Sequence, residues 1–136
     1  MVPGANATDR VSRPFSDYNW APRWKATANL GWNTGAIRAN VAGRFIGKYR
    51  DYEPLADGTY LNLGSFWVCD ANIRFDAGKS LASGNSWLSG TYVELGAVNL
   101  FNNLPQFSNT LAGTGFDGTQ ADLRGRFLYG KIGFKW

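Results

Sequence analysis

The sequence predicts an all-β protein arranged as an antiparallel up-and-down meander. Three observations support this fold class: the composition, an apolar-polar alternation at every second residue, and connections that alternate in length. The 136 residues include 6 Trp, 6 Tyr, 9 Phe and 17 Gly, and only 18% are charged. Such a composition excludes a disordered chain and a charged helical bundle. The length allows one domain at most.

The chain divides into an irregular segment over residues 1–22 and a strand region over residues 23–136. Three of the five prolines fall in the first segment, among Asn, Ser, Asp and Gly, which is typical of loops. The first predicted strand then places its apolar residues on one parity, at Trp24, Ala26, Ala28, Leu30 and Trp32. A tight turn at 33–35 leads to a second strand that alternates from Ile37 as far as Arg50.

Three further strands follow at similar spacing. The alternation predicts, in order, an acidic loop at 51–60, a strand at 67–75, a Gly- and Ser-rich turn at 76–90, a strand at about 91–101, a long loop at 102–121 and a last strand that reaches Trp136. The connections alternate between short and long. Short turns on one rim and long loops on the other are typical of outer-membrane barrels.

The apolar rows favour lipid over a protein core as their environment. They contain many small residues, which would fill a core poorly, and aromatic residues near the strand ends, which would form the girdles at the two membrane interfaces. An ordinary antiparallel sheet with tryptophan in its core is the alternative. On the same reasoning, Cys69 is a small apolar side chain in the row of Trp67 and Ala71.

The opposite rows are polar and contain the candidate ligand-binding residues. They are Arg38, Arg44, Lys48 and Arg50 along one side of the second strand, with Asp70, Arg74 and Glu94 on the strands that follow. Two interpretations are open: these side chains line a wet channel wall in ion pairs, or they form a positively lined path for an anionic ligand. We favour the first.

Several classes of enzyme are excluded by missing residues. The chain has no His and one Cys, so it cannot build a Ser-His-Asp or Cys-His catalytic unit, a Cys-only zinc site or an internal disulfide. We therefore expect no enzyme activity, metal or cofactor. The acidic residues Asp51, Glu53 and Asp57 suggest paired carboxylates or a cation site, but acidic residues are common in solvated loops. No export signal begins the chain, and no apolar stretch is long enough for a membrane helix.

Three segments carry a resemblance to a known family. Residues 95–103, Leu-Gly-Ala-Val-Asn-Leu-Phe-Asn-Asn, followed by Pro105, resemble the Gly-Val-x-Asn-Leu-Phe-Asp/Asn signature near the end of TonB-dependent outer-membrane receptors. Residues 122–136 are similar to the last strand of that family, which contains Arg and Gly and ends on an aromatic residue. The hairpin of residues 22–47 is similar to an earlier strand pair of the same receptors.

The resemblance implies a 22-stranded barrel in the bacterial outer membrane, closed by an N-terminal plug, that imports a scarce ligand such as a ferric siderophore, cobalamin or a glycan. This chain would be the C-terminal part of that barrel, about five strands, without the plug. Its expected partners are outer-membrane lipid and the barrel assembly machinery, which would read Leu128, Gly130, Ile132, Phe134 and Trp136; the TonB system would contact only the N-terminal part. The antiparallel order then places the loops 51–60 and 102–121 at the cell surface.

A soluble all-β module that binds nucleic acid or carbohydrate is the alternative function. A net charge of +4 and the many aromatic residues suggest it. However, basic and aromatic residues lie on opposite faces of the second strand, whereas a base-stacking surface needs them together. We therefore expect no nucleic-acid partner. An open sheet of five strands would also leave two edges unpaired in lipid, so we expect it to need further strands to span a membrane.

Overall fold

A computed structural model describes residues 22–80, 89–109 and 114–134 of the chain. The described residues are almost all in strands or loops. The elements are β1 (Lys25–Thr34), β2 (Ile37–Ile46), β3 (Tyr49–Arg50), β4 (Asn62–Leu63), β5 (Phe66–Asp76), the single-turn helix α1 (Ala77–Ser80), β6 (Tyr92–Val98) and β7 (Phe127–Gly133). The all-β prediction is therefore confirmed. None of the helical residues described forms a segment long and apolar enough to cross a bilayer.

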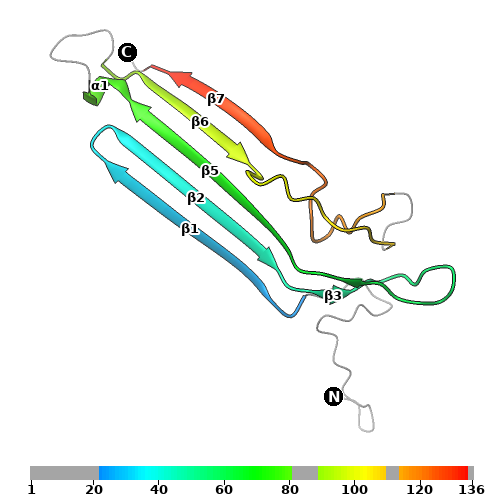
Figure 1. The fold of residues 1–136 in the computed structure, drawn as a ribbon. Helices are drawn as coiled ribbons and strands as arrows, with labels where there is room; N and C mark the ends of the chain where they lie inside the picture. The colour runs from blue at the N-terminus through cyan, green and yellow to red at the C-terminus, as the bar shows by residue number, and fades with distance from the viewer. Residues whose placement is uncertain (1–21, 81–88, 110–113, 135–136) are drawn as a thin grey trace, which may run out of the picture. The chain divides into compact units, whose positions relative to one another are not determined.

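Five strands form one sheet in the order β1-β2-β5-β6-β7, with neighbouring strands antiparallel (Figure 1). Each of these strands pairs with the next of them along the chain, as the predicted meander requires. The short strands β3 and β4 form a separate two-stranded pair between β2 and β5 in the sequence. Within the described residues, β1 and β7 are the edges of the larger sheet.

The described chain falls into two compact units. We call the first the loop unit; its described residues are 22–25, 45–66, 105–109 and 114–123, and it contains the β3-β4 pair. The second is the sheet unit; its described residues are 26–44, 67–80, 89–104 and 124–134, and it contains most of the larger sheet.

The second strand is shorter than predicted, because it ends at Ile46 and not at Arg50. The Gly47 N–H donates to the Trp24 carbonyl at 2.8 Å, and Tyr49 and Arg50 then pair with β4. The alternation of apolar and polar residues continues across this break, so the sequence pattern shows one strand where the structure has two. The prediction of a single strand through Arg50 is wrong.

The register of β5, β6 and β7 separates an apolar face from a polar one. Residues that lie opposite one another in neighbouring strands share a face. The rows on the apolar face are Ala71, Ala97 and Leu128; Ile73, Leu95 and Gly130; and Phe75, Val93 and Ile132. The rows on the polar face are Asn72, Gly96 and Tyr129; Arg74, Glu94 and Lys131; and Asp76, Tyr92 and Gly133, and the apolar pair Val98 and Phe127 lies at the end of this face.

Tyrosine rings cover two glycines on the polar face. Gly96 lies opposite Tyr129, and a Cβ atom at Gly96 would lie 2.5 Å from the Tyr129 hydroxyl oxygen. Gly133 lies opposite Tyr92, and a Cβ atom there would lie 2.7 Å from the Tyr92 hydroxyl oxygen. A side chain at either glycine would therefore force the tyrosine ring to move. These glycines are therefore the positions that let the neighbouring tyrosines lie flat across the sheet.

The segment after β6 is held by asparagines in the left-handed backbone region. Asn99 has φ 51° and Asn102 has φ 55°, a conformation that asparagine tolerates better than most residues. The Asn99 amide nitrogen donates to the Asn103 carbonyl at 2.7 Å, and the Asn99 Oδ1 accepts the Asn103 N–H at 2.9 Å. The predicted fourth strand therefore ends at Val98, three residues before Phe101.

The same segment joins three parts of the sheet unit. The Asn103 side chain donates to the Trp67 carbonyl at the start of β5, and the Asn99 N–H donates to Asp70. The Asn102 Oδ1 accepts the Arg126 N–H just before β7. The motif that carries the family resemblance thus fixes the chain between β5, β6 and β7.

Candidate functional site

The polar face of the sheet unit brings together five of the seven candidate ligand-binding residues. Asp76 is buried and lies between two of them. Its Oδ2 accepts the Arg38 Nε at 3.0 Å, and its Oδ1 accepts the Arg74 Nε at 2.9 Å. One carboxylate that the sequence analysis did not select therefore neutralises part of the charge of two selected arginines.

The central row of this face continues the pairing across three strands. Glu94 lies between Arg74 and Lys131 in the register, and the Lys131 ammonium lies 3.4 Å from its Oε1. The same oxygen accepts the Tyr129 hydroxyl. The Arg74 guanidinium also lies over the Tyr92 ring, 3.5 Å from its centroid. Cations, carboxylates and tyrosines therefore form one connected row.

Arg44 and Asp70 form a second ion pair, with 3.1 Å between Nη2 and Oδ2. The other Asp70 oxygen accepts the Asn99 N–H, so the carboxylate is held from two sides. The Arg44 side chain is 55% exposed, and exposed pairs of this kind contribute little stability, about 0–1 kcal/mol each. Ion pairs therefore join neighbouring strands across the polar face.

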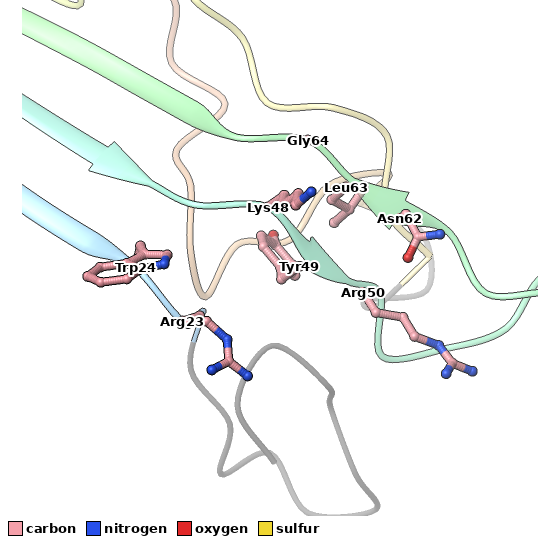
Figure 2. A pocket seen from close by; sticks show the side chains of 8 residues that line it. All are labelled: Arg23, Trp24, Lys48, Tyr49, Arg50, Asn62, Leu63 and Gly64. Atoms are coloured by element: carbon pink, nitrogen blue, oxygen red, sulfur yellow. The ribbon is translucent and has the colours of Figure 1, made fainter. Parts of the chain in front are cut away.

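The remaining two candidates, Lys48 and Arg50, lie in the loop unit, where they line a hollow of about 720 Å³ (Figure 2). We call it the basic hollow; its lining residues are Arg23, Trp24, Lys48, Tyr49, Arg50, Asn62, Leu63 and Gly64. The first two come from the chain that enters β1, and the others from the β3-β4 pair and its flanks. Sequence reasoning missed Arg23, Trp24 and Asn62 as parts of a common site, because nothing in the local pattern places 23–24 beside 48–64.

Contacts with the long loop at 105–123 hold the floor of the basic hollow. The Tyr49 hydroxyl donates to Asp117 Oδ2 at 2.9 Å, and the Gly64 N–H donates to Gln106 Oε1 at 2.8 Å. Tyr49 and Leu63 are opposite one another in the β3-β4 pair, and both are buried. Two segments far apart in the sequence therefore form one packed unit.

The Asp51 carboxylate accepts hydrogen bonds from the protein and is not arranged as a cation ligand. It is fully buried and accepts the Ser108 hydroxyl at 2.9 Å and the Asn109 N–H at 2.7 Å. Asp57 is exposed, and hydrogen bonds from the Thr59 hydroxyl and N–H lower the pKa of its carboxyl. The described residues contain no group of three side chains arranged to hold a metal ion.

The predicted assembly signal lies on the apolar face of β7 and just beyond it. Leu128, Ile132 and Phe134 are 66%, 75% and 65% exposed. Gly130 faces the same side, between Leu128 and Ile132, while Trp136 lies outside the described residues. A continuous apolar row therefore lies on the surface at one edge of the sheet.

Comparison with known proteins identifies no relative. The chain matches no family model, no curated protein and no solved structure.

Raising the pH above about 10 is expected to destabilise the loop unit through Tyr49. Burial, and then the Asp117 carboxylate, raise the pKa of the Tyr49 hydroxyl well above its usual value. Below pH 10 the hydroxyl is protonated in both folded and unfolded chains, so its contribution to stability is complete. Above pH 10 the unfolded chain loses this proton while the folded chain keeps it, so stability falls as pH rises.

Urea unfolding of the wild type and of Tyr49→Phe at pH 8 and pH 11 tests this expectation. The variant should be less stable at pH 8 by about 1 kcal/mol, the usual contribution of one hydrogen bond, and the difference should shrink at pH 11. A difference that is the same at both pH values would contradict the role assigned to the Tyr49 proton.

Proposed function

We propose that the chain forms the C-terminal wall of a transmembrane β-barrel in a TonB-dependent outer-membrane receptor, which imports a scarce ligand such as a ferric siderophore, cobalamin or a glycan. The single observation that carries the proposal is the two-sided sheet: one face is apolar and exposed, and the other is charged and ion-paired. A barrel wall between lipid and a wet interior requires this division.

The amount of buried apolar surface also supports the proposal. Among the described residues, the buried apolar side chains are Tyr49, Leu63, Ala77 and Ala97, and two of these are alanines. Many large apolar side chains of the sheet unit are instead exposed, among them Leu30 at 75%, Ile73 at 50% and Leu95 at 59%. A water-soluble domain is stabilised mainly by burying such side chains. In a barrel wall, lipid would cover them.

The loop lengths fit the same proposal. The connection between β1 and β2 is a tight turn at Gly35, whereas the stretches 47–65 and 99–126 on the other rim are long. Because the last strand of such a barrel ends on the periplasmic side, the long connections would lie at the cell surface. The basic hollow, most of whose lining residues lie in the stretch 47–65, would then face the medium.

Adjacent positions in β5 offer a direct test of the two faces. Asn72 lies on the polar face and Ile73 on the apolar face, at the same depth in the sheet. In a Cys69→Ser background, Asn72→Cys and Ile73→Cys are introduced separately into the protein expressed from its own gene. Whole cells are then treated with a sulfonated, membrane-impermeant thiol reagent.

The proposal expects Asn72→Cys to react through the water inside the barrel and Ile73→Cys to be protected by lipid. Placing a charged group on the lipid face at mid-membrane costs about 2–4 kcal/mol, so the rate at Ile73→Cys should be lower by about tenfold or more. A fluorophore attached at Ile73→Cys should be quenched by a nitroxide-labelled lipid. Equal rates at both positions, without lipid quenching, would overturn the proposal and favour a water-soluble module.

A further inference from the structure

The basic hollow differs from the polar face of the sheet in its charge balance. The four cations on β2, β5 and β7, namely Arg38, Arg44, Arg74 and Lys131, each pair with a carboxylate. Among the described residues that line the hollow, three are cationic and none is acidic. Its volume of about 720 Å³ is within the range of about 300–1,000 Å³ that is usual for small-molecule sites.

Two of these cations keep their charge available to a ligand. Within the described part of the chain, no carboxylate lies at ion-pair distance from the Lys48 ammonium or the Arg50 guanidinium. The Arg50 guanidinium lies 3.9 Å from the centroid of the Tyr60 ring. A ring face orients a guanidinium without neutralising it or using its in-plane N–H donors.

The hollow is also preformed. Its floor is the buried pair Tyr49 and Leu63, and the hydrogen bonds from Tyr49 to Asp117 and from Gly64 to Gln106 fix that floor from behind. A ligand would therefore have to order little of the protein when it binds, which reduces the entropic cost of binding.

Trp24 adds a flat apolar surface to the wall of the hollow. Its indole is 71% exposed, and its backbone carbonyl accepts the Gly47 N–H, which holds the residue beside the segment that leads into β3. In Figure 2 the guanidinium groups of Arg23 and Arg50 extend to the same side of the pair, on either side of Tyr49. An aromatic side chain next to cations is suited to a ligand that has both a ring and a negative charge.

We propose that the basic hollow binds a small organic anion in which a phosphate or carboxylate group is joined to a flat ring. Lys48 and Arg50 bind the anionic group, and the Trp24 indole stacks on the ring. The inference depends on the loop unit alone, so it holds whether or not the sheet spans a membrane.

Fluorine NMR of the full chain, labelled with 5-fluorotryptophan and held in neutral detergent micelles, tests the inference. The variant Trp24→Phe assigns the Trp24 resonance. Phenyl phosphate and benzoate are the probes, with inorganic phosphate and neutral phenyl glucoside as comparison compounds. We expect phenyl phosphate or benzoate to shift the Trp24 resonance saturably, and the stronger of the two identifies the anionic group preferred.

Substitutions with equal loss of charge separate the hollow from general attraction to a basic chain. Lys48→Gln and Arg50→Gln, each made singly, should weaken binding about tenfold, as should added salt, because the attraction between exposed charges is screened. Lys79→Gln is the control, because Lys79 is an exposed residue of α1 outside the hollow; it should leave the affinity nearly unchanged.

Three binding results would overturn the inference. They are a Trp24 resonance that no anion shifts, equal binding of phenyl glucoside and phenyl phosphate, and equal weakening by Lys79→Gln and Lys48→Gln. A spectrum without dispersed tryptophan resonances would also overturn it, because the packed loop unit that forms the hollow would then be absent. None of these results bears on the thiol labelling of β5, so failure of this inference is distinguishable from failure of the proposed function.

Discussion

Replacing Gly96 by alanine is expected to destabilise the folded chain by about 1–3 kcal/mol, the usual cost of forcing extra atoms into a filled space. The new Cβ would lie 2.5 Å from the Tyr129 hydroxyl oxygen and 2.6 Å from its Cε1, closer than such atoms can approach. Gly96 and Tyr129 are opposite each other in paired strands, so neither backbone can move away without breaking the ladder. The tyrosine must leave its position and give up its hydrogen bond to Glu94.

A double-mutant cycle tests this explanation. The free energy of unfolding in urea is measured for wild type, Gly96→Ala, Tyr129→Ala and the double variant. If the clash is the cause, Gly96→Ala should cost much less in the Tyr129→Ala background. Gly43→Ala in β2 is the matched control, because no atom lies within 4 Å of a Cβ placed there. A similar loss of stability from both glycine substitutions would show that chain stiffness, and not the ring, is responsible.

The contact between Tyr92 and Gly133 shows what the tyrosine–glycine pairs contribute to the polar face. The Tyr92 ring lies across Gly133 and under the Arg74 guanidinium, which is 3.5 Å from the ring centroid. A ring that lies flat in this way covers the backbone of the next strand and orients a cation above it. At two positions of the polar face, glycines are thus sites where tyrosines pack.

Much of the fold could be predicted from the sequence because it depends on a pattern that repeats at every second residue along each strand. Alternation of apolar and polar residues specifies each long strand and the face of each residue, and the turn at Gly35 and the long loops specify the order. The β3-β4 pair could not be predicted in this way. It depends on the hydrogen bond from the Gly47 N–H to the Trp24 carbonyl and on the burial of Tyr49 opposite Leu63. Both contacts join segments that are distant in the sequence.

For the candidate site, the sequence likewise predicts the face on which each residue lies but not the residue with which it pairs. Parity alone places Arg38, Arg44, Arg74 and Glu94 on the polar side. It does not give their partners, because the pairing of Arg38 with Asp76 joins residues 38 positions apart. The bonds from Ser108 to Asp51 and from Tyr49 to Asp117 join residues 57 and 68 positions apart. Such contacts follow from the fold as a whole, so no spacing in the sequence indicates them.

Replacing Asn99 by alanine is expected to destabilise the chain by about 2–4 kcal/mol. Asn99 is 3% exposed and has φ 51°, and the left-handed region costs an alanine about 1–2 kcal/mol. The Asn103 N–H and the carbonyls of Asn103 and Arg124 would also lose the Asn99 amide as their partner. An unsatisfied buried polar group costs about 1–3 kcal/mol.

Two glycine variants separate the backbone contribution from that of the side chain. Asn99→Gly keeps the positive φ at no steric cost but removes the amide, so it should recover only part of the stability that Asn99→Ala loses. Asn102→Gly is the control, because Asn102 has nearly the same φ but is exposed and accepts one hydrogen bond, from the Arg126 N–H. It should cost less than Asn99→Gly in urea unfolding.

The outcome decides what the Asn-Leu-Phe-Asn-Asn segment does. If Asn99→Gly is as stable as wild type, the segment is only a turn that needs a left-handed residue, and the hydrogen bonds of the amide contribute nothing. If Asn99→Gly lies between wild type and Asn99→Ala, the amide holds the chain between β6 and the residues that lead into β7. In that case the motif that resembles a receptor signature acts in folding, by positioning the last strand, and the residues that bind a ligand lie elsewhere.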